Sequence, residues 1–385
     1  MQLVFITGMF RSGTSLLARC VDGHPRVTIA PDAYLDVFKL LRNKIYSRHG
    51  VEWERDAPLP DNFFNPHEEA QAAVQASAMD VEVSAEDLAH LTTRVATRCA
   101  LFSPAVIPHL AEVRPGLLRD VFWQLLEIVR IAYGGPDTLY VGTKDAWCEE
   151  FIRPLVNAFP DAKVLHIVRD PRATIASKKA RGSGMYPILF LIRHWRKTYA
   201  YHLLNRHLTD NYMMLRYEDI IASPEREMRR VSEALGVAYT PSMVDPSHFS
   251  DGKGGRWTQN SSYGTSTEIT GRFADRWKTV LTPTELRFIE ELCEFEMERL
   301  GYARLTEPDF PATIAAPPEY PRAELAEWTL RYFDPKPSGA DMLQEAVRRC
   351  VLQDALLQAD RALVRRAFIT GEFFVSSGEA HAPVR

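Results

Sequence analysis

The chain has 385 residues, of which 46% are hydrophobic and 25% are charged. This length accommodates one large α/β domain, or one domain with an extension, and the composition is ordinary for a globular protein. With 46 basic and 50 acidic side chains the formal charge is −4. That charge provides no global basic field for a nucleic-acid partner, so any anion site must be local.

The cysteines and the apolar runs bear on cellular location. The cysteines form no CxxC pair and show no zinc spacing, so we expect free thiols in a reducing compartment and no metal site. No run of about 18 apolar residues occurs, so no membrane span is expected. The first residues resemble a core strand rather than a signal peptide. Together these features predict a cytoplasmic protein. The five cysteines are Cys20, Cys99, Cys148, Cys293 and Cys350.

The first third of the chain predicts a strand, a helix and a long insertion. Residues 2–8, "QLVFITG", form a short apolar run that ends in glycine, as a buried parallel strand does. The segment "GTSLLARCVDGHP" predicts a helix that Gly23 and Pro25 stop. Residues 35–135 are mostly helical in pattern, with an irregular stretch at "DAPLPDNFFNPHEE". We interpret them as a helical cap inserted between core strands.

Strand and helix patterns alternate through the middle of the chain. We expect strands at "TLYVGTKD", "AKVLHIVRD" and "YMMLRYED", and helices at "PLVNAF", from "PRATIASKKA", at "PILFLIRHWRKTYAYHLLNRHL" and after Ser223. Alternation of this kind predicts a parallel sheet covered on both faces.

The last third predicts a loop, a closing helix and an extension. A Gly-, Ser- and Thr-rich loop follows residue 250, and "TPTELRFIEELCEFEMERLGY" is patterned as a helix. The predicted organisation is a domain over 1–305, a Pro-rich linker over 306–324 and a helical C-terminal extension over 325–385. The fold class is therefore α/β, a P-loop three-layer fold with a central parallel sheet, a large helical insertion and a C-terminal helical extension.

The segment "ITGMFRSGTSLL" has the spacing of a phosphate-binding loop. Gly8 and Gly13 stand five apart, and the backbone amides of residues 8–15 open a helix, which makes an anion nest. A nucleoside-triphosphate P-loop places lysine where Thr14 stands here. The cation within this loop is Arg11, whose planar fork suits an oxyanion.

The segment "IVRDPRATIAS" predicts a second phosphate site. Arg169 follows a predicted strand, at the edge where open parallel sheets place ligands, and Ser177 lies on the next helix. We interpret Asp170 as a helix cap and Arg172 as a surface residue of the first turn. Two phosphate sites without a Walker lysine favour a nucleotide that is phosphorylated at both ends of its ribose.

On these residues the chain resembles the sulfotransferase family, which uses 3′-phosphoadenosine 5′-phosphosulfate (PAPS). "GMFRSGTSLL" is similar to its 5′-phosphosulfate loop and "VLHIVRDPRATIAS" to its 3′-phosphate segment, and "DGHPRV", "VGTKD", "LRYEDI" and "LGY" are further anchors. The arginine in the loop resembles the tyrosylprotein sulfotransferase type and its bacterial relatives. The resemblance runs from residue 3 to about 302, outside the cap.

The resemblance implies a role for each matching residue. Arg11 and Lys144 would hold the sulfuryl oxygens, Thr14 and Ser15 the 5′-phosphate, and Arg169 with Ser177 the 3′-phosphate. Ser261 would contact the nucleotide from the loop, with Ser262 as its alternative. The PAPS-binding set is Gly8, Arg11, Ser12, Gly13, Thr14, Ser15, Arg169, Ser177, Tyr217 and Ser261.

The general base is identified by counting from the loop arginine. The tyrosylprotein type carries a glutamate 21 residues after it, and that count leads to Asp32, one methylene shorter. A helix cap is an equal alternative role for Asp32. His24 is a competing base at a helix end, whereas His166 sits within a strand and is expected in the core. A sulfuryl group carries less negative charge than a phosphoryl group, so Arg11, Lys144 and helix-end amides would suffice without a metal.

Two other functions stay open from the sequence. One is a P-loop kinase or NTPase, for which Asp145 or Asp170 would be the magnesium carboxylate. The other is a degenerate nucleotide-binding module without activity. The acceptor is expected to bear a hydroxyl or amine, on a small molecule, sugar, lipid or peptide, and the C-terminal helices could form a homodimer.

Overall fold

A five-stranded parallel sheet forms the centre of the protein, which a computed structural model describes over residues 1–179, 186–258, 264 and 266–374. The strand order is β2-β5-β1-β6-β7, and every neighbouring pair is parallel. The strands are β1 (Gln2–Gly8), β2 (Val27–Pro31), β5 (Tyr140–Lys144), β6 (Lys163–Val168) and β7 (Tyr212–Arg216).

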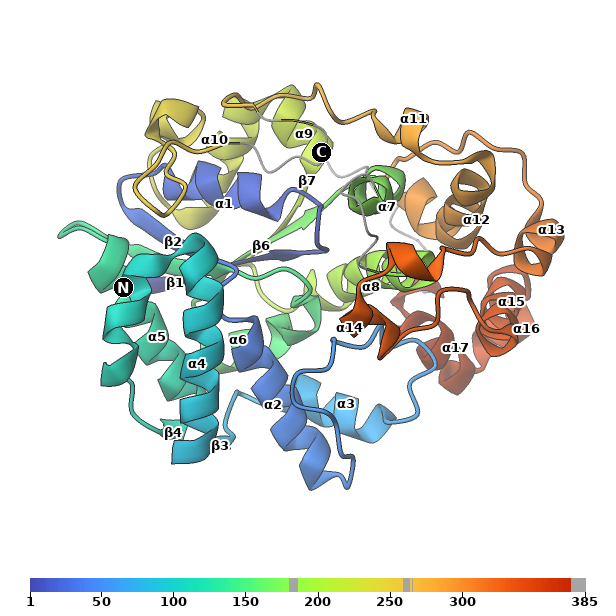
Figure 1. Cartoon of the computed structure of the whole chain (residues 1–385), viewed down its shortest axis with the longest axis horizontal. Helices are drawn as coiled ribbons and strands as arrows, with labels where there is room; N and C mark the ends of the chain where they lie inside the picture. The colour runs from blue at the N-terminus through green and yellow to red at the C-terminus, as the bar shows by residue number, and fades with distance from the viewer. Residues whose placement is uncertain (180–185, 259–263, 265, 375–385) are drawn as a thin grey trace.

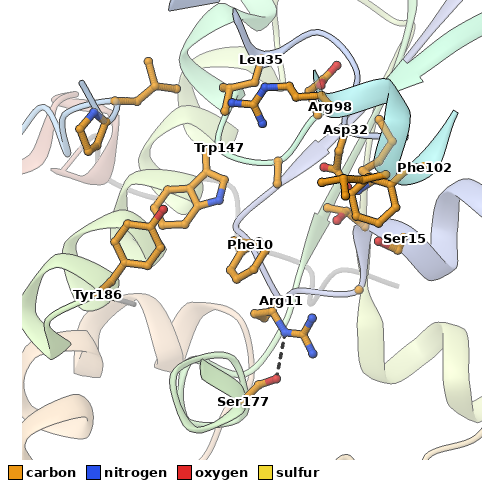
Figure 2. Close-up of a pocket in the computed structure, with 18 of the residues that line it drawn as sticks. Phe10, Arg11, Ser15, Asp32, Leu35, Arg98, Phe102, Trp147, Ser177 and Tyr186 are labelled. Carbon is orange, nitrogen blue, oxygen red and sulfur yellow. Dashed lines mark hydrogen bonds and ion pairs between the residues drawn. The ribbon is translucent and has the colours of Figure 1, made fainter. Parts of the chain in front are cut away.

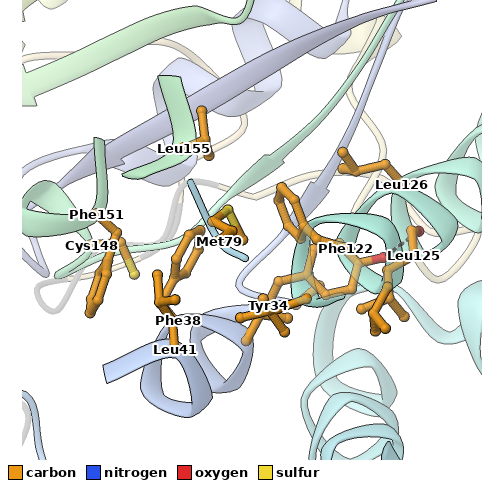
Figure 3. Close-up of a cluster of buried hydrophobic side chains, with 14 of the residues drawn as sticks. Tyr34, Phe38, Leu41, Met79, Phe122, Leu125, Leu126, Cys148, Phe151 and Leu155 are labelled. Carbon is orange, nitrogen blue, oxygen red and sulfur yellow. Dashed lines mark hydrogen bonds between the residues drawn. The ribbon is translucent and has the colours of Figure 1, made fainter. Parts of the chain in front are cut away.

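The central strand β1 is buried on both faces, which explains its continuous apolar run. Leu3 and Phe5 point into one core cluster and Val4 and Ile6 into another. The first cluster packs under α2 (Leu35–Arg48), α5 (Leu118–Tyr133) and α6 (Ile152–Ala158), where aromatic side chains such as Phe38 interlock (Figure 3). The second packs under α1 (Thr14–Asp22), α9 (Tyr217–Ala222) and α10 (Pro224–Leu235). The three-layer α/β fold is thus confirmed.

The carboxyl ends of the strands meet at one edge of the sheet. The register pairs Ile6 of β1 and Pro31 of β2 with Lys144, and Val168 of β6 with Arg216. The loops after β1, β2, β5, β6 and β7 therefore leave the sheet side by side. This is the edge at which open α/β sheets bind ligands.

A helical cap fills the chain between β2 and β5. Besides α2 and α5 it contains α3 (Glu68–Ala76), α4 (Ala85–Phe102), the 3-10 segment Pro104–Glu112 and the short antiparallel pair β3 (Glu82–Val83) and β4 (Gly116–Leu117). Ser84 and Asp87 form a capping box that fixes the start of α4. Figure 1 shows these helices gathered on one side of the sheet.

Helix α8 (Ile188–Asn205) and the C-terminal helices pack beside the cap in a third core cluster, which reaches Val168 of β6 and Met214 of β7 (Figure 1). Arg196 of α8 donates two hydrogen bonds to Glu345 of α15, at 2.5 and 3.0 Å, and Arg193 donates a third at 2.9 Å. These buried ion pairs fasten the extension to the core. The helices are α7 (Pro171–Lys179), α8 (Ile188–Asn205), α11 (Trp277–Val280), α12 (Pro283–Arg299), α13 (Phe310–Ala315), α14 (Glu327–Leu330), α15 (Gly339–Gln353), α16 (Ala355–Ala359) and α17 (Arg361–Phe368).

Three elements differ from the sequence prediction. Strand β2 was not predicted, because Pro25 and Pro31 bracket a run of only a few residues. Tyr217 was expected inside a strand but begins α9. The segment 306–324, expected as a linker, contains α13. Within the described ranges no helix has the length and apolar character that crossing a bilayer requires.

Candidate active site

A cavity of about 660 Å³ opens at the carboxyl edge of the sheet (Figure 2). Its floor comes from the loops after the strands, and its walls come from the cap and the C-terminal helices. Of the predicted site residues, Arg11, Gly13, Thr14, Ser15, Asp32, Lys144, Arg169, Ser177 and Tyr217 all line it. The topology therefore brings together residues that are up to about 200 positions apart in the sequence.

The loop after β1 is shaped for close approach to a ligand. Gly13, at the N-cap of α1, has φ +99°, and a Cβ there would lie 2.3 Å from the Tyr217 ring. Ser12 is turned inward, and both its hydroxyl and its N–H donate to the Met9 carbonyl, at 2.6 and 3.0 Å. Ser12 and Gly8 therefore shape the loop, whereas Thr14 and Ser15 face the cavity.

The two predicted phosphate segments touch each other. Arg11 Nε donates to Ser177 Oγ at 3.0 Å, as Figure 2 shows, and Arg169 Nη1 donates to the Arg11 carbonyl at 3.2 Å. The Arg169 guanidinium also stacks over the Tyr217 ring, 4.2 Å from its centroid. One nucleotide can therefore span both segments.

Arg169 still has hydrogen-bonding capacity at this point. Its Nε is buried and has no hydrogen-bond partner among the described residues. A buried, unsatisfied guanidinium N–H is costly unless a ligand supplies an acceptor. The unpaired Nε–H of Arg169 could donate to a phosphate oxygen, and the loop at Gly13 has no room for a side chain but allows a ligand to approach the backbone. Both features are compatible with a phosphorylated nucleotide.

Asp32 and Lys144 form an ion pair at the edge of the cavity. Lys144 Nζ donates to Asp32 Oδ2, and the Asp32 N–H donates to the Lys144 carbonyl at 2.5 Å. The lysine side chain is 2% exposed and the aspartate 31%. Asp32 does not cap a helix, because α2 begins at Leu35 and its N-cap is Tyr34. Asp32 lines the cavity, and its role as a general base stays a prediction.

Three residues that line the cavity have a left-handed backbone conformation. Arg11, Asp32 and Trp147 have φ values of 74°, 53° and 74°, which non-glycine residues seldom adopt, and all three line the cavity. Such strain costs about 1–3 kcal/mol per residue and clusters at functional sites.

Asp145 follows Lys144 in the sequence, borders the same cavity and is fully buried. Its Oδ1 accepts the Tyr34 N–H at 2.8 Å and its Oδ2 accepts the Thr143 hydroxyl at 2.6 Å. Burial raises the pKa of Asp145 to about 6, and the charge of Asp32 adds to the rise against the opposing hydrogen bonds. Asp145 therefore holds the segment that carries Asp32 in place.

The remaining predicted residues have structural roles or lie elsewhere. The ring of His24 bonds the Ala238 carbonyl at 3.0 Å and accepts the Arg26 N–H at 3.1 Å, so it is not a base at this cavity. His166 is buried against the Tyr212 hydroxyl at 2.6 Å, as expected for a core histidine. Ser261 and Ser262 lie outside the described residues.

Asp170 and Arg172 form a buried pair. Asp170 accepts the Arg172 N–H at 2.8 Å, which confirms it as a helix cap. The prediction that Arg172 is a surface residue is wrong: it is 4% exposed and also donates to Glu290 at 2.7 Å. Both Asp170 oxygens are held by Arg172, which commits this carboxylate to structure rather than to magnesium.

The sequence did not reveal the side of the cavity that the cap and the aromatic side chains form. Its cations are Lys39, Arg94 and Arg98 of the cap, and its aromatic wall is Phe10, Trp147, Tyr186, Phe190 and Trp328. These residues were missed because charges along a helix usually mark a solvent-exposed face, and because the aromatic side chains come from separate segments of the sequence. One feature could have indicated them: Arg94 and Arg98 stand four apart on α4, which puts both on one face of the helix.

Comparison with known proteins identifies the family. Residues 3–241, more than half of the chain, match the family described as "Sulfotransferase family". The chain belongs to the sulfotransferase family. The family-level prediction is thereby confirmed.

Individual relatives are more distant. Carbohydrate sulfotransferase 2 from Homo sapiens is 25% identical over 195 residues, which covers 39% of this chain and 36% of that protein. Carbohydrate sulfotransferase 3 from Tetronarce californica is 27% identical over 174 residues, covering 40% and 39%. The chain thus spans little more than a third of the length of these relatives. Among solved structures, a sulfotransferase domain from the curacin biosynthetic pathway is 18% identical with a TM-score of 0.47, covering 79% of this chain and 99% of that one.

Proposed function

We propose that this sulfotransferase-family protein transfers the sulfuryl group of PAPS to a hydroxyl or amine acceptor and releases 3′,5′-adenosine bisphosphate. The observation that carries the proposal is the convergence of the loop at residues 8–15, Arg169 with Ser177, and the Lys144–Asp32 pair on one cavity. Each group supplies a different part of sulfuryl transfer.

Arg11, Thr14 and Ser15 are placed to bind the 5′ end of the nucleotide. The loop amides and the Arg11 fork supply donors to the phosphate and sulfuryl oxygens, while Arg169 and Ser177 supply donors to the 3′-phosphate. Stacking of Arg169 on Tyr217 holds the guanidinium in position. Positioning and charge neutralisation of this kind account for most catalysis of group transfer.

Asp32 and Lys144 are placed for the proton and the leaving group. The acceptor oxygen forms a bond to sulfur while the bond between sulfur and the bridging phosphate oxygen breaks. Asp32 accepts the hydroxyl proton, as a general base within reach of the cavity must. The ammonium of Lys144 has three donors, so it can hold Asp32 and also stabilise the negative charge that builds on the leaving oxygen.

Several finer points belong to this proposal. The loop arginine supports a tyrosylprotein-type arrangement, whereas the relatives matched by sequence are named carbohydrate sulfotransferases. Peptide, sugar, lipid and small-molecule acceptors therefore remain alternatives for experiment. A cytoplasmic location stays a prediction. So does a homodimer through the C-terminal helices, which the exposed Leu343 and Leu356 support.

Ligand-dependent thermal stability tests the proposal. A ligand that binds only the folded state at 100 times its Kd stabilises it by about 2.7 kcal/mol. We expect 3′,5′-adenosine bisphosphate to stabilise the protein without magnesium, and labelled PAPS to donate its label in an acceptor screen. Stabilisation by ATP that depends on magnesium would indicate a kinase instead, and no response to either nucleotide would indicate a degenerate module.

Arg169→Ala sharpens the test. Removing the buried guanidinium should weaken bisphosphate binding by about tenfold or more, because charge-assisted bonds contribute roughly 1.5–3 kcal/mol each. Arg119→Ala, which removes a half-exposed arginine of α5, is the control. Equal binding by the two variants would mean that the 3′-phosphate site has been misplaced.

A further inference from the structure

Three cations of the cap line the side of the cavity away from the nucleotide loop. Lys39 comes from α2, and Arg94 and Arg98 come from adjacent turns of α4. Figure 2 shows Arg98 at one end of the cavity and Arg11 with Ser177 at the other. These cations are therefore distinct from the donors that face the nucleotide.

Carboxylates surround this cluster. Asp36 pairs with Arg98 Nε, and Asp36 and Asp56 lie 3.6 and 3.5 Å from Arg94 Nε. The charges of Asp145 and Asp32 also act on Arg98, so the cluster attracts an anion through its open donors rather than through an excess of charge. Burial lowers the pKa of Lys39 to about 8, Asp36 opposes this change, and the charges of Arg98, Arg42 and Arg94 add to it.

The arginine forks retain donors for a ligand. Arg98 Nε donates a hydrogen bond to Asp36. Within the described ranges, the Nη groups of Arg98 and of Arg94 make no hydrogen bond to protein. The Arg98 and Arg94 side chains are 27% and 34% exposed, and both line the cavity. A guanidinium with two open N–H groups is the side chain best suited to bind a carboxylate, phosphate or sulfate.

The position of Asp32 relates the cluster to the reaction. Figure 2 shows the aspartate between the Arg98 end and the Arg11 end of the cavity, with Phe10 and Trp147 along the wall. An acceptor whose hydroxyl reaches Asp32 therefore has room to extend its other end toward α4. There it meets the cationic donors of α4, beside the Asp56 carboxylate and the apolar side chains of Leu101 and Phe102.

We propose that the acceptor carries an oxyanion group, which Arg94 and Arg98 bind at the cap wall while its hydroxyl lies at Asp32. This inference rests on the proposed function and specifies its substrate class. Neutral alcohols that match the acceptor in shape would leave the arginine donors unsatisfied and bind more weakly. The oxyanion can be a carboxylate or a phosphate ester, and the experiment separates the two.

The test measures probe binding by calorimetry with the nucleotide site saturated by bisphosphate, so that no probe anion can enter it. The probe pairs are para-hydroxybenzoate against para-hydroxybenzamide, glucuronate against glucose, and a glucose phosphate against glucose. We expect at least one acidic probe to bind roughly tenfold to a hundredfold more tightly than its neutral partner. Added salt should reduce the preference.

Variants then assign the preference to the cap. Arg94→Gln removes a guanidinium that makes no hydrogen bond to another described residue, and Arg98→Lys keeps the charge beside Asp36 but loses the fork. Both should lose most of the preference while they still bind bisphosphate, which shows that they are folded. Arg55→Gln, another cap arginine, which pairs with Asp87 and lies outside the cavity lining, should keep it.

The outcomes separate this inference from the function beneath it. If bisphosphate binds normally but no acidic probe is preferred, or if the preference survives in both variants, the acceptor is not anionic and the inference is overturned. If bisphosphate itself does not bind the wild-type protein, the proposed function fails and the inference falls with it.

Discussion

Asp145→Asn tests how the reaction centre is held together. The carboxylate is buried and accepts one hydrogen bond from Tyr34 and one from Thr143. Asparagine has the same shape, and its amide oxygen can accept the Tyr34 N–H. Its amide nitrogen can donate to Thr143 Oγ, whose hydroxyl already has the Ala30 carbonyl within 3.1 Å as a second acceptor. The substitution therefore removes a charge and leaves the hydrogen bonds satisfiable.

The magnitude follows from the pKa of Asp145. Burial, with a contribution from Asp32, raises this pKa from 3.8 to about 6 in the folded protein. The folded state therefore binds more protons than the unfolded state between about pH 4 and about pH 6, and stability falls as pH rises through that window. A difference of roughly two pKa units, at about 1.4 kcal/mol per unit, destabilises the wild-type protein by ~3 kcal/mol at neutral pH.

Urea denaturation as a function of pH measures this effect. The free energy of unfolding of Asp145→Asn relative to wild type should rise by ~3 kcal/mol between pH 4 and pH 7, because the variant has no charge to bury. Carboxyls that do not interact with Asp145 titrate equally in both proteins and cancel in the difference. Asp137→Asn, at an exposed loop position, should give a curve parallel to wild type. A parallel curve for Asp145→Asn as well would refute the reasoning.

Three further substitutions probe other parts of the molecule. Lys144→Met should lower kcat in the labelled-donor assay by about 10²–10³ while bisphosphate affinity changes far less, and an equal loss of both would make it a binding residue only. Gly13→Ala places a Cβ 2.3 Å from the Tyr217 ring at φ +99°, so bisphosphate affinity by calorimetry should fall at least ~10-fold, and unchanged affinity would contradict the loop geometry. Glu345→Gln leaves two buried guanidinium groups on α8 short of a counter-charge and should cost ~3 kcal/mol or more in urea denaturation, whereas a loss under ~1 kcal/mol would show that the ion pairs do not hold the extension.

The nucleotide side of the cavity was predictable because its signals are local. Gly8, Lys144 and Arg169 each stand at the end of a mainly apolar run, and such a run that ends in glycine or a cation indicates the carboxyl end of a buried strand. Parallel topology then brings those ends together without further information. The parallel character of the sheet and the family followed from the same few segments.

Residues whose surroundings come from distant segments were not predictable. Arg172 was expected on the surface, but its partner Glu290 lies 118 positions away and burial depends on that pairing. Strand β2 was missed because its short run is flanked by prolines, although "VTIA" has the β-branched character of a buried strand. Tyr217 illustrates the boundary error: the strand ends one residue earlier, and the tyrosine begins α9 beneath Arg169.

The two sides of the cavity therefore differ in how the sequence specifies them. Donor-side groups belong to the sheet edge, where backbone geometry fixes a loop, a lysine and an arginine in register. The opposite wall also contains side chains of the core, such as Phe10 and Phe190, but it adds Arg98 of α4 from the insertion and Trp328 of α14 from the extension. Trp328 lies beyond the residues that match the family. Buried ion pairs fasten the extension to α8, and this attachment brings Trp328 to the cavity. There the Trp328 ring packs on the Tyr186 ring, with 5.2 Å between the ring centroids. A change of acceptor can thus arise through α4 and α14 without any change in the nucleotide loop, which is the arrangement expected where one transfer chemistry serves different substrates.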